Sequence, residues 1–126
     1  MYVGVCRLVI HAEHSHSLKE KRAVIRRLKD RARTRLEVTM AEVAAQDTWQ
    51  RIVLGFAIAG GDRRRIEDTI SKVVALIEKA GDGRVIDVQR EVIPFRADES
   101  LAEAIAPEED QSWVPPEWLD TDDGSR

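Results

Sequence analysis

The stretch IVLGFAIAGGD, residues 52–62, contains the pattern on which the fold of this chain depends. Large apolar side chains alternate with small ones along residues 52–59, which is the two-residue period of a β-strand. The large positions are Ile52, Leu54, Phe56 and Ile58. We expect the large side to face helices and the small side to form the other face of a sheet. Gly60 and Gly61 end the strand, and Asp62 is a candidate N-cap for a helix.

Two strands and a helix are expected before this stretch. Residues 2–12 are apolar on both alternating sets, which predicts a central strand covered on both faces. Ser17 and Glu20 form a capping box, in which the hydroxyl and the carboxylate accept N–H groups of a first helical turn. The buried stripe of this helix is expected at Leu18, Ile25, Leu28 and Ala32. Residues 36–45 then alternate with one polar face, which predicts an edge strand.

A second helix and a last strand are expected after it. The apolar side of the helix consists of Ile66, Ile70, Val73 and Ile77. The helix ends near Gly81, and the last strand covers residues 84–93 and ends before Pro94. This order of elements predicts an α+β, ferredoxin-like sandwich with a four-stranded antiparallel sheet and two helices on one face. Its first and third strands lie in the middle.

Length and charge indicate one domain followed by a distinct tail. A chain of 126 residues suits a single domain, which we place at residues 1–95. That range contains 18 Lys or Arg and 13 Asp or Glu, whereas residues 96–126 contain two and ten. The single cysteine, Cys6, excludes a disulfide framework. Because the N-terminal segment has neither a leader's charge pattern nor a membrane helix's length, we expect a cytoplasmic protein without a membrane partner.

The helices of this fold leave one face of the sheet uncovered. The small side of residues 52–59 and one apolar set of the first strand lie on that face, and monomers seldom expose such a patch. We expect either a second copy of the chain or the acidic tail to cover it. Trp113 and Trp118 are the candidate anchors in the tail, unless this segment is disordered.

Residues 17–35 hold nine Lys or Arg against two acidic side chains. At about 100° per residue, five of these cations fall within a sector of roughly 80° beside the buried stripe. We call them the cationic ridge: Lys19, Arg22, Arg26, Lys29 and Arg33. Arg63, Arg64 and Arg65 begin the second helix and are expected to join the ridge in one basic surface for a phosphate backbone. The alternative is a solvated helix face.

The segment QDTWQR, residues 46–51, contains Asp47, Trp49, Gln50 and Arg51. As structure, Asp47 satisfies a turn and Trp49 fixes it to the sheet. As a recognition site, Trp and Arg suit a surface that binds protein or stacks on bases. As an active site the segment lacks a nucleophile. We favour the structural interpretation and keep recognition open.

Other chemistries find little support in the sequence. In an extended segment, His11 points away from His14 and His16, so we expect no metal site. A Gly-containing phosphate loop, a Walker loop, a nucleophile elbow and a Cys paired with a nearby His are all absent. We therefore expect neither a cofactor nor an enzyme.

Four blocks of the sequence resemble the YlxP-like family, small bacterial proteins of unknown function. They are SLKEKR at 17–22, AEV at 41–43, QDTWQR at 46–51 and VLGFA at 53–57. The resemblance covers about residues 1–93 and leaves the tail outside. It implies a ferredoxin-like fold, a bacterial cytoplasmic protein, and genes often found beside those for translation initiation and ribosome maturation factors. It implies no known reaction.

The sequence supports two main functional hypotheses. The first is a non-enzymatic RNA- or ribosome-associated accessory domain that uses the cationic ridge and the Arg63–Arg65 cluster. The second is a homodimer, paired through the open sheet face, that recognises a protein partner with the QDTWQR corner. A small hydrolase or phosphatase is a third hypothesis, for which we find no nucleophile.

Overall fold

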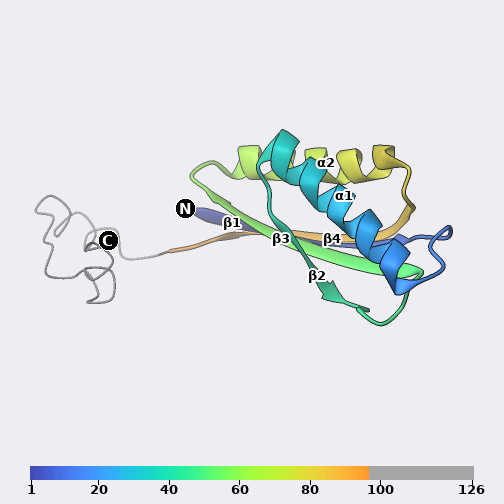
Figure 1. Ribbon diagram of the computed structural model, residues 1–126. Coiled ribbons are helices and arrows are strands. Elements are labelled where there is room, and N and C mark those ends of the chain that lie inside the picture. The colour runs from blue at the N-terminus through green and yellow to red at the C-terminus, as the bar shows by residue number, and fades with distance from the viewer. Residues whose placement is uncertain (97–126) are drawn as a thin grey trace, which may run out of the picture. The chain divides into compact units, whose positions relative to one another are not determined.

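The computed structural model describes residues 1–96 and contains the six elements that the sequence predicts, in the predicted order. The strands and helices are β1 (Tyr2–His11), α1 (Leu18–Leu36), β2 (Met40–Ala44), β3 (Arg51–Gly60), α2 (Arg63–Ala80) and β4 (Arg84–Pro94). The sheet is antiparallel with the order β2-β3-β1-β4, so β1 and β3 are central. Both helices lie on one side of it (Figure 1). The predicted α+β, ferredoxin-like fold is confirmed.

The core lies between the sheet and the two helices. Ile52, Leu54 and Phe56 of β3 are buried in it, and Ile58 is half-buried. The large side of β3 therefore faces the helices, as the alternation predicts. At Gly4 of β1, α2 comes so close that an added Cβ would collide with the side chain of Ile66.

The helix ends follow from their caps. Ser17 Oγ accepts the N–H of Glu20 at 3.1 Å, and an Asp62 carboxylate oxygen accepts the N–H of Arg64 at 3.0 Å. The Glu20 carboxylate accepts the N–H of His16 at 2.6 Å, one residue before the cap, rather than a group inside the first turn. At the other end of α2, Gly81 adopts the left-handed conformation with φ of 76°.

Two predicted boundaries are wrong. The strand expected at 36–45 begins at Met40, because Leu36 ends α1 and Glu37 is its C-cap with φ of 57°. The apparent alternation before Met40 comes from a helix end and a short connection. The last strand includes Pro94, which an edge strand tolerates because its outer N–H groups need no partner. The predicted edge position of β2 is correct.

The face of the sheet opposite the helices is uncovered by residues 1–96, and Val5 and Val43 are exposed on it. Val53 lies on the same face but is buried among its neighbours. Residues Met1–Phe95 form one compact unit. Residues 97–126 of the predicted tail, with Trp113 and Trp118, lie outside the described residues. No helix within residues 1–96 is both long and apolar enough to cross a membrane.

Candidate nucleic-acid interface

The cationic ridge runs along the side of α1 that faces the β2 edge of the sheet. Four of its members line a shallow hollow of about 390 Å³: Arg22, Arg26, Lys29 and Arg33. Glu42 of β2 lines the same hollow, which places this side of α1 over that edge. Lys19 is exposed one turn nearer the N-terminus of the helix. The predicted ridge is thus one continuous surface strip.

The two acidic side chains in this hollow already have basic partners. Glu42 lies 2.9 Å from Lys21 Nζ, and Asp30 lies 3.1 Å from a guanidinium nitrogen of Arg33. In contrast, Arg22, Arg26 and Lys29 have no carboxylate partner within residues 1–96. Four ridge cations from Lys19 to Lys29, spread over about 15 Å of helix, remain available to an external anion.

Lys21 is the most deeply buried charged side chain among the described residues, at 1% exposure. Besides its ion pair with Glu42, its ammonium donates to the carbonyl of Ala45 at 2.5 Å and to that of Thr48 at 2.7 Å. The ammonium thus makes two hydrogen bonds to carbonyls, and it lies in ion-pair distance of Glu42 Oε2, a buried oxygen without a hydrogen-bond partner among the described residues. Lys21 therefore ties the start of α1 to the connection between β2 and β3.

The structural role of Lys21 was not predicted, although the sequence contains a signal for it. Lys21 lies three residues after Leu18 and four before Ile25, on the buried stripe of the helix. Lysine is almost never fully buried without a partner, so helical spacing alone did not distinguish Lys21 from the exposed cations around it. Because Lys21 lies at a buried position of the helix, it needed an acidic partner from another element.

The QDTWQR corner is held in place by Lys21. Trp49 is 48% exposed, and its predicted role of fixing the turn to the sheet stays a prediction. Asp47 and Arg51 are also exposed, whereas the carbonyl of Gln50 accepts the N–H of Ala12 at 2.9 Å. The corner is thus a backbone-anchored turn that presents an indole and two charges to solvent.

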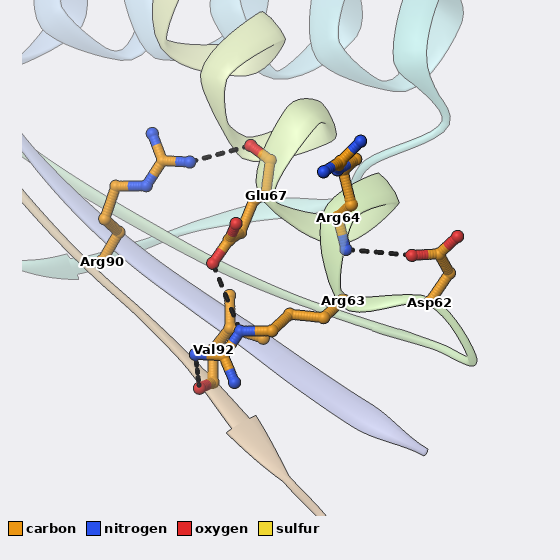
Figure 2. Close-up of polar contacts among 6 residues, drawn as sticks. All are labelled: Asp62, Arg63, Arg64, Glu67, Arg90 and Val92. Atoms are coloured by element: carbon orange, nitrogen blue, oxygen red, sulfur yellow. Dashed lines mark hydrogen bonds and ion pairs between the residues drawn. The ribbon is translucent and has the colours of Figure 1, made fainter.

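The Arg63–Arg65 cluster does not extend the ridge at Arg63. Its guanidinium lies 3.4 Å from a Glu67 carboxylate oxygen and 3.5 Å from the carbonyl of Val92 in β4 (Figure 2). Because β4 and β2 are opposite edges of the sheet, Arg63 and the ridge lie on opposite sides of the helical layer. The expected single basic surface therefore excludes Arg63.

The other two arginines of the cluster have separate surroundings. Arg64 is exposed, and its backbone N–H donates to the capping Asp62 (Figure 2). Arg65 lines a different hollow, beside Gly60 and Thr69. Nearby, Arg90 of β4 donates to the carbonyl of Glu67 at 2.8 Å, which ties α2 to the sheet. Within the cluster, the Arg63 side chain is thus the one shown to hydrogen-bond to another element of the fold in the described residues.

Cys6, the single cysteine of the sequence, lies in the buried core. Burial raises the pKa of the Cys6 thiol above its usual value, and the nearby Arg90 charge offsets this only in part. A buried thiol of raised pKa is a poor nucleophile at neutral pH. Within residues 1–96, no three His, Cys, Asp or Glu side chains lie close enough together to hold a metal ion.

Comparisons with known proteins identify a family that matches most of the described residues. Residues 3–90 match the family described as "Protein of unknown function (DUF503)". "Uncharacterized protein YlxP" from Bacillus subtilis (strain 168) is 37% identical over 73 residues, which cover 58% of this chain and 77% of that protein. The solved structure of protein YJCS has a TM-score of 0.47 at 10% identity, over 71% of this chain and 96% of its own. The de novo designed protein Foldit4 has a TM-score of 0.47 at 16% identity, over 75% and 98%.

Proposed function

This chain belongs to the DUF503 family of proteins of unknown function, and we propose that it is a non-enzymatic accessory domain that binds the phosphate backbone of structured RNA on α1. The predicted resemblance to YlxP-like proteins is confirmed by the 37% identity with Bacillus YlxP. Neither comparison names an RNA or a reaction, so the proposal stands on the geometry of the ridge and on the gene neighbourhood that the resemblance implies.

The observation that carries the proposal is which cations of the ridge are in ion pairs and which are not. The acids of its hollow are paired with Lys21 and Arg33, while Arg22, Arg26 and Lys29 project without a carboxylate partner in the described part of the chain. An ordinary solvated helix face intersperses acids with its bases, so that its charges compensate locally. The ridge instead leaves a row of uncompensated cations at i, i+3 and i+4 spacing, which suits a row of phosphates.

The open sheet face is the less suitable surface for RNA. Domains that bind RNA on a sheet stack bases on aromatic side chains of the central strands. In β3 the aromatic residue is Phe56, and its side chain is buried toward the helices. In β1 the aromatic residue is Tyr2, which packs against the core. We therefore assign RNA contact to the helical side.

The test is the salt dependence of binding to a ribosomal RNA hairpin, followed by fluorescence anisotropy. The slope of log K against log salt is negative, and each lost phosphate contact lowers its magnitude by about 0.7 to 0.9. The double variant Arg22→Gln/Arg26→Gln is expected to lower this magnitude by about 1.4 to 1.8. The matched control Lys72→Gln/Lys79→Gln removes two exposed cations of α2 and is expected to leave it unchanged. Equal slopes for the two variants would show that the ridge is not the contact surface.

A second candidate function is recognition of a protein partner by the QDTWQR corner. The observation in its favour is that a half-exposed Trp49 lies on a turn anchored by the buried Lys21, because exposed Trp on a rigid support is typical of binding hot spots. Association that persists at high salt, is lost in Trp49→Ala and is kept in Arg22→Gln/Arg26→Gln would favour this function over RNA binding.

A further inference from the structure

The exposed apolar side chains of this protein gather on one face. Of the seven large apolar side chains that are exposed within residues 1–96, Val5, Val43 and Ile93 lie on the open sheet face. Met1 and Phe95 continue the alternation at one end of that face, where the N–H of Phe95 donates to the carbonyl of Met1 at 2.8 Å. None of these five side chains belongs to the cationic ridge, to a helix or to the buried core. Surfaces with this concentration of apolar groups usually have a partner.

The centre of this face is a broad hollow of about 720 Å³ with a mixed lining. Its floor includes Gly55 and Ala57, and Val43 lies on the β2 side. Arg7 projects from the central strand and donates to the Gln89 side chain at 3.1 Å, and Glu91 lies beside Gln89 on the β4 side. The small floor residues leave room for side chains of an opposing surface.

This face has charges of both signs, so it can be complementary to the same face of a second copy of the chain. By strand register, Arg7 lies opposite Gln89, and its neighbours on the β4 side are Asp87 and Glu91. None of these three charged side chains is in an ion pair within residues 1–96. A polyanion would meet Asp87 and Glu91, and a cationic partner would meet Arg7. About a two-fold axis that passes between these residues, Glu91 of one chain meets Arg7 of the other, and the contact occurs twice.

The size of the face is adequate for a stable dimer. Three strands of ten or eleven residues are about 33 Å long, and β2, with five residues, is about half as long; at about 4.8 Å per strand they cover about 550 Å² in projection. Side-chain relief raises the accessible area above this projection. A standard interface buries about 800 Å² per partner. The face therefore has the area of one standard interface, and packing two such faces is the usual geometry of a sheet-on-sheet core.

We infer that the open sheet face is a self-association surface, on which a second copy of this chain packs through the same face about a two-fold axis. The apolar strip of Val5, Val43 and Ile93 forms its centre, and reciprocal Arg7–Glu91 pairs fix its register. The helices of both copies then point outward, and each cationic ridge stays accessible. This inference does not depend on the proposed RNA binding.

The test is sedimentation velocity of the full chain over a concentration series. The native chain is expected to be a dimer, and Val5→Glu, which places a charge in the apolar strip, is expected to shift it to monomer. Ala75→Glu adds the same charge on the exposed side of α2 and is expected to leave the dimer intact. Unchanged circular dichroism in each variant excludes loss of folding as the cause.

A charge exchange tests the register of the dimer separately from its existence. Arg7→Glu faces Glu91 of the partner copy and is expected to weaken dimerisation about tenfold or more. Arg7→Glu/Glu91→Arg restores opposite charges and is expected to recover most of the loss. A native chain that is monomeric throughout the series overturns the inference. A monomer that dimerises only after removal of residues 97–126 also overturns it, because the tail would then be the occupant of this face.

Discussion

Replacing Lys21 by Met is the sharpest test of how the corner between β2 and β3 is held. The substitution keeps the length of the side chain and removes the ammonium, so that Glu42 loses its ion pair and the carbonyls of Ala45 and Thr48 lose their donor. Removing one partner of a buried ion pair costs about 3 to 5 kcal/mol. The Glu42 side chain is 23% exposed as a whole, but the Oε2 atom beside Lys21 is buried, so we expect a loss of at least about 3 kcal/mol.

The assay is urea unfolding followed by circular dichroism. A loss of about 3 kcal/mol lowers the midpoint without changing the m value, and in a domain of this size it lowers Tm by at least about 12 °C. Lys19→Met, two residues earlier on the exposed side, is expected to change stability by less than about 0.5 kcal/mol. Lys21→Met/Glu42→Leu is expected to recover part of the loss, because no unpaired carboxylate remains. A Lys21→Met protein as stable as Lys19→Met would refute the argument.

Three further substitutions or reactions test other parts of the structure. Gly4→Ala puts a methyl group against Ile66 of α2 and is expected to destabilise the domain by about 1 to 3 kcal/mol, measured by urea unfolding. Glu37→Gly relieves the left-handed C-cap of α1 and removes an acid from the negative end of the helix, and a gain of about 0.5 to 1 kcal/mol is expected in the same assay. Because burial raises the pKa of Cys6, its thiol is expected to react with Ellman's reagent far more slowly in the native protein than in urea, at every pH near neutrality. Equal rates in both states would show that the thiol is accessible.

The fold was predictable because its local patterns agree with one another. The alternation of residues 52–59, the cap at Ser17 and the cap at Asp62 each predict the element that the structure contains. The boundary at Met40 was missed because a helix end and a strand can both place apolar residues two apart, as at Leu36 and Val38. Only the hydrogen bonds of the Glu37 cap, to the carbonyls of Ala32 and Arg33, distinguish the two cases.

The candidate site was predictable in part. Helical spacing alone places the ridge residues together, and the structure keeps Arg22, Arg26 and Lys29 around one hollow. The same spacing does not say which edge of the sheet a helix side faces, so the separation of Arg63 from the ridge required the tertiary structure. The role of Lys21 was hidden for another reason: its carboxylate partner lies 21 residues away on a different element.

The most direct test of RNA contact by α1 is a map of backbone amide chemical shifts in the labelled full chain as a ribosomal RNA hairpin is added at low salt. The account predicts that the largest changes fall on residues 19–33, with smaller changes at the adjoining corner, and that they disappear as salt is raised. Changes centred on β1 and β4 of the open face, or no changes at low salt, would contradict it.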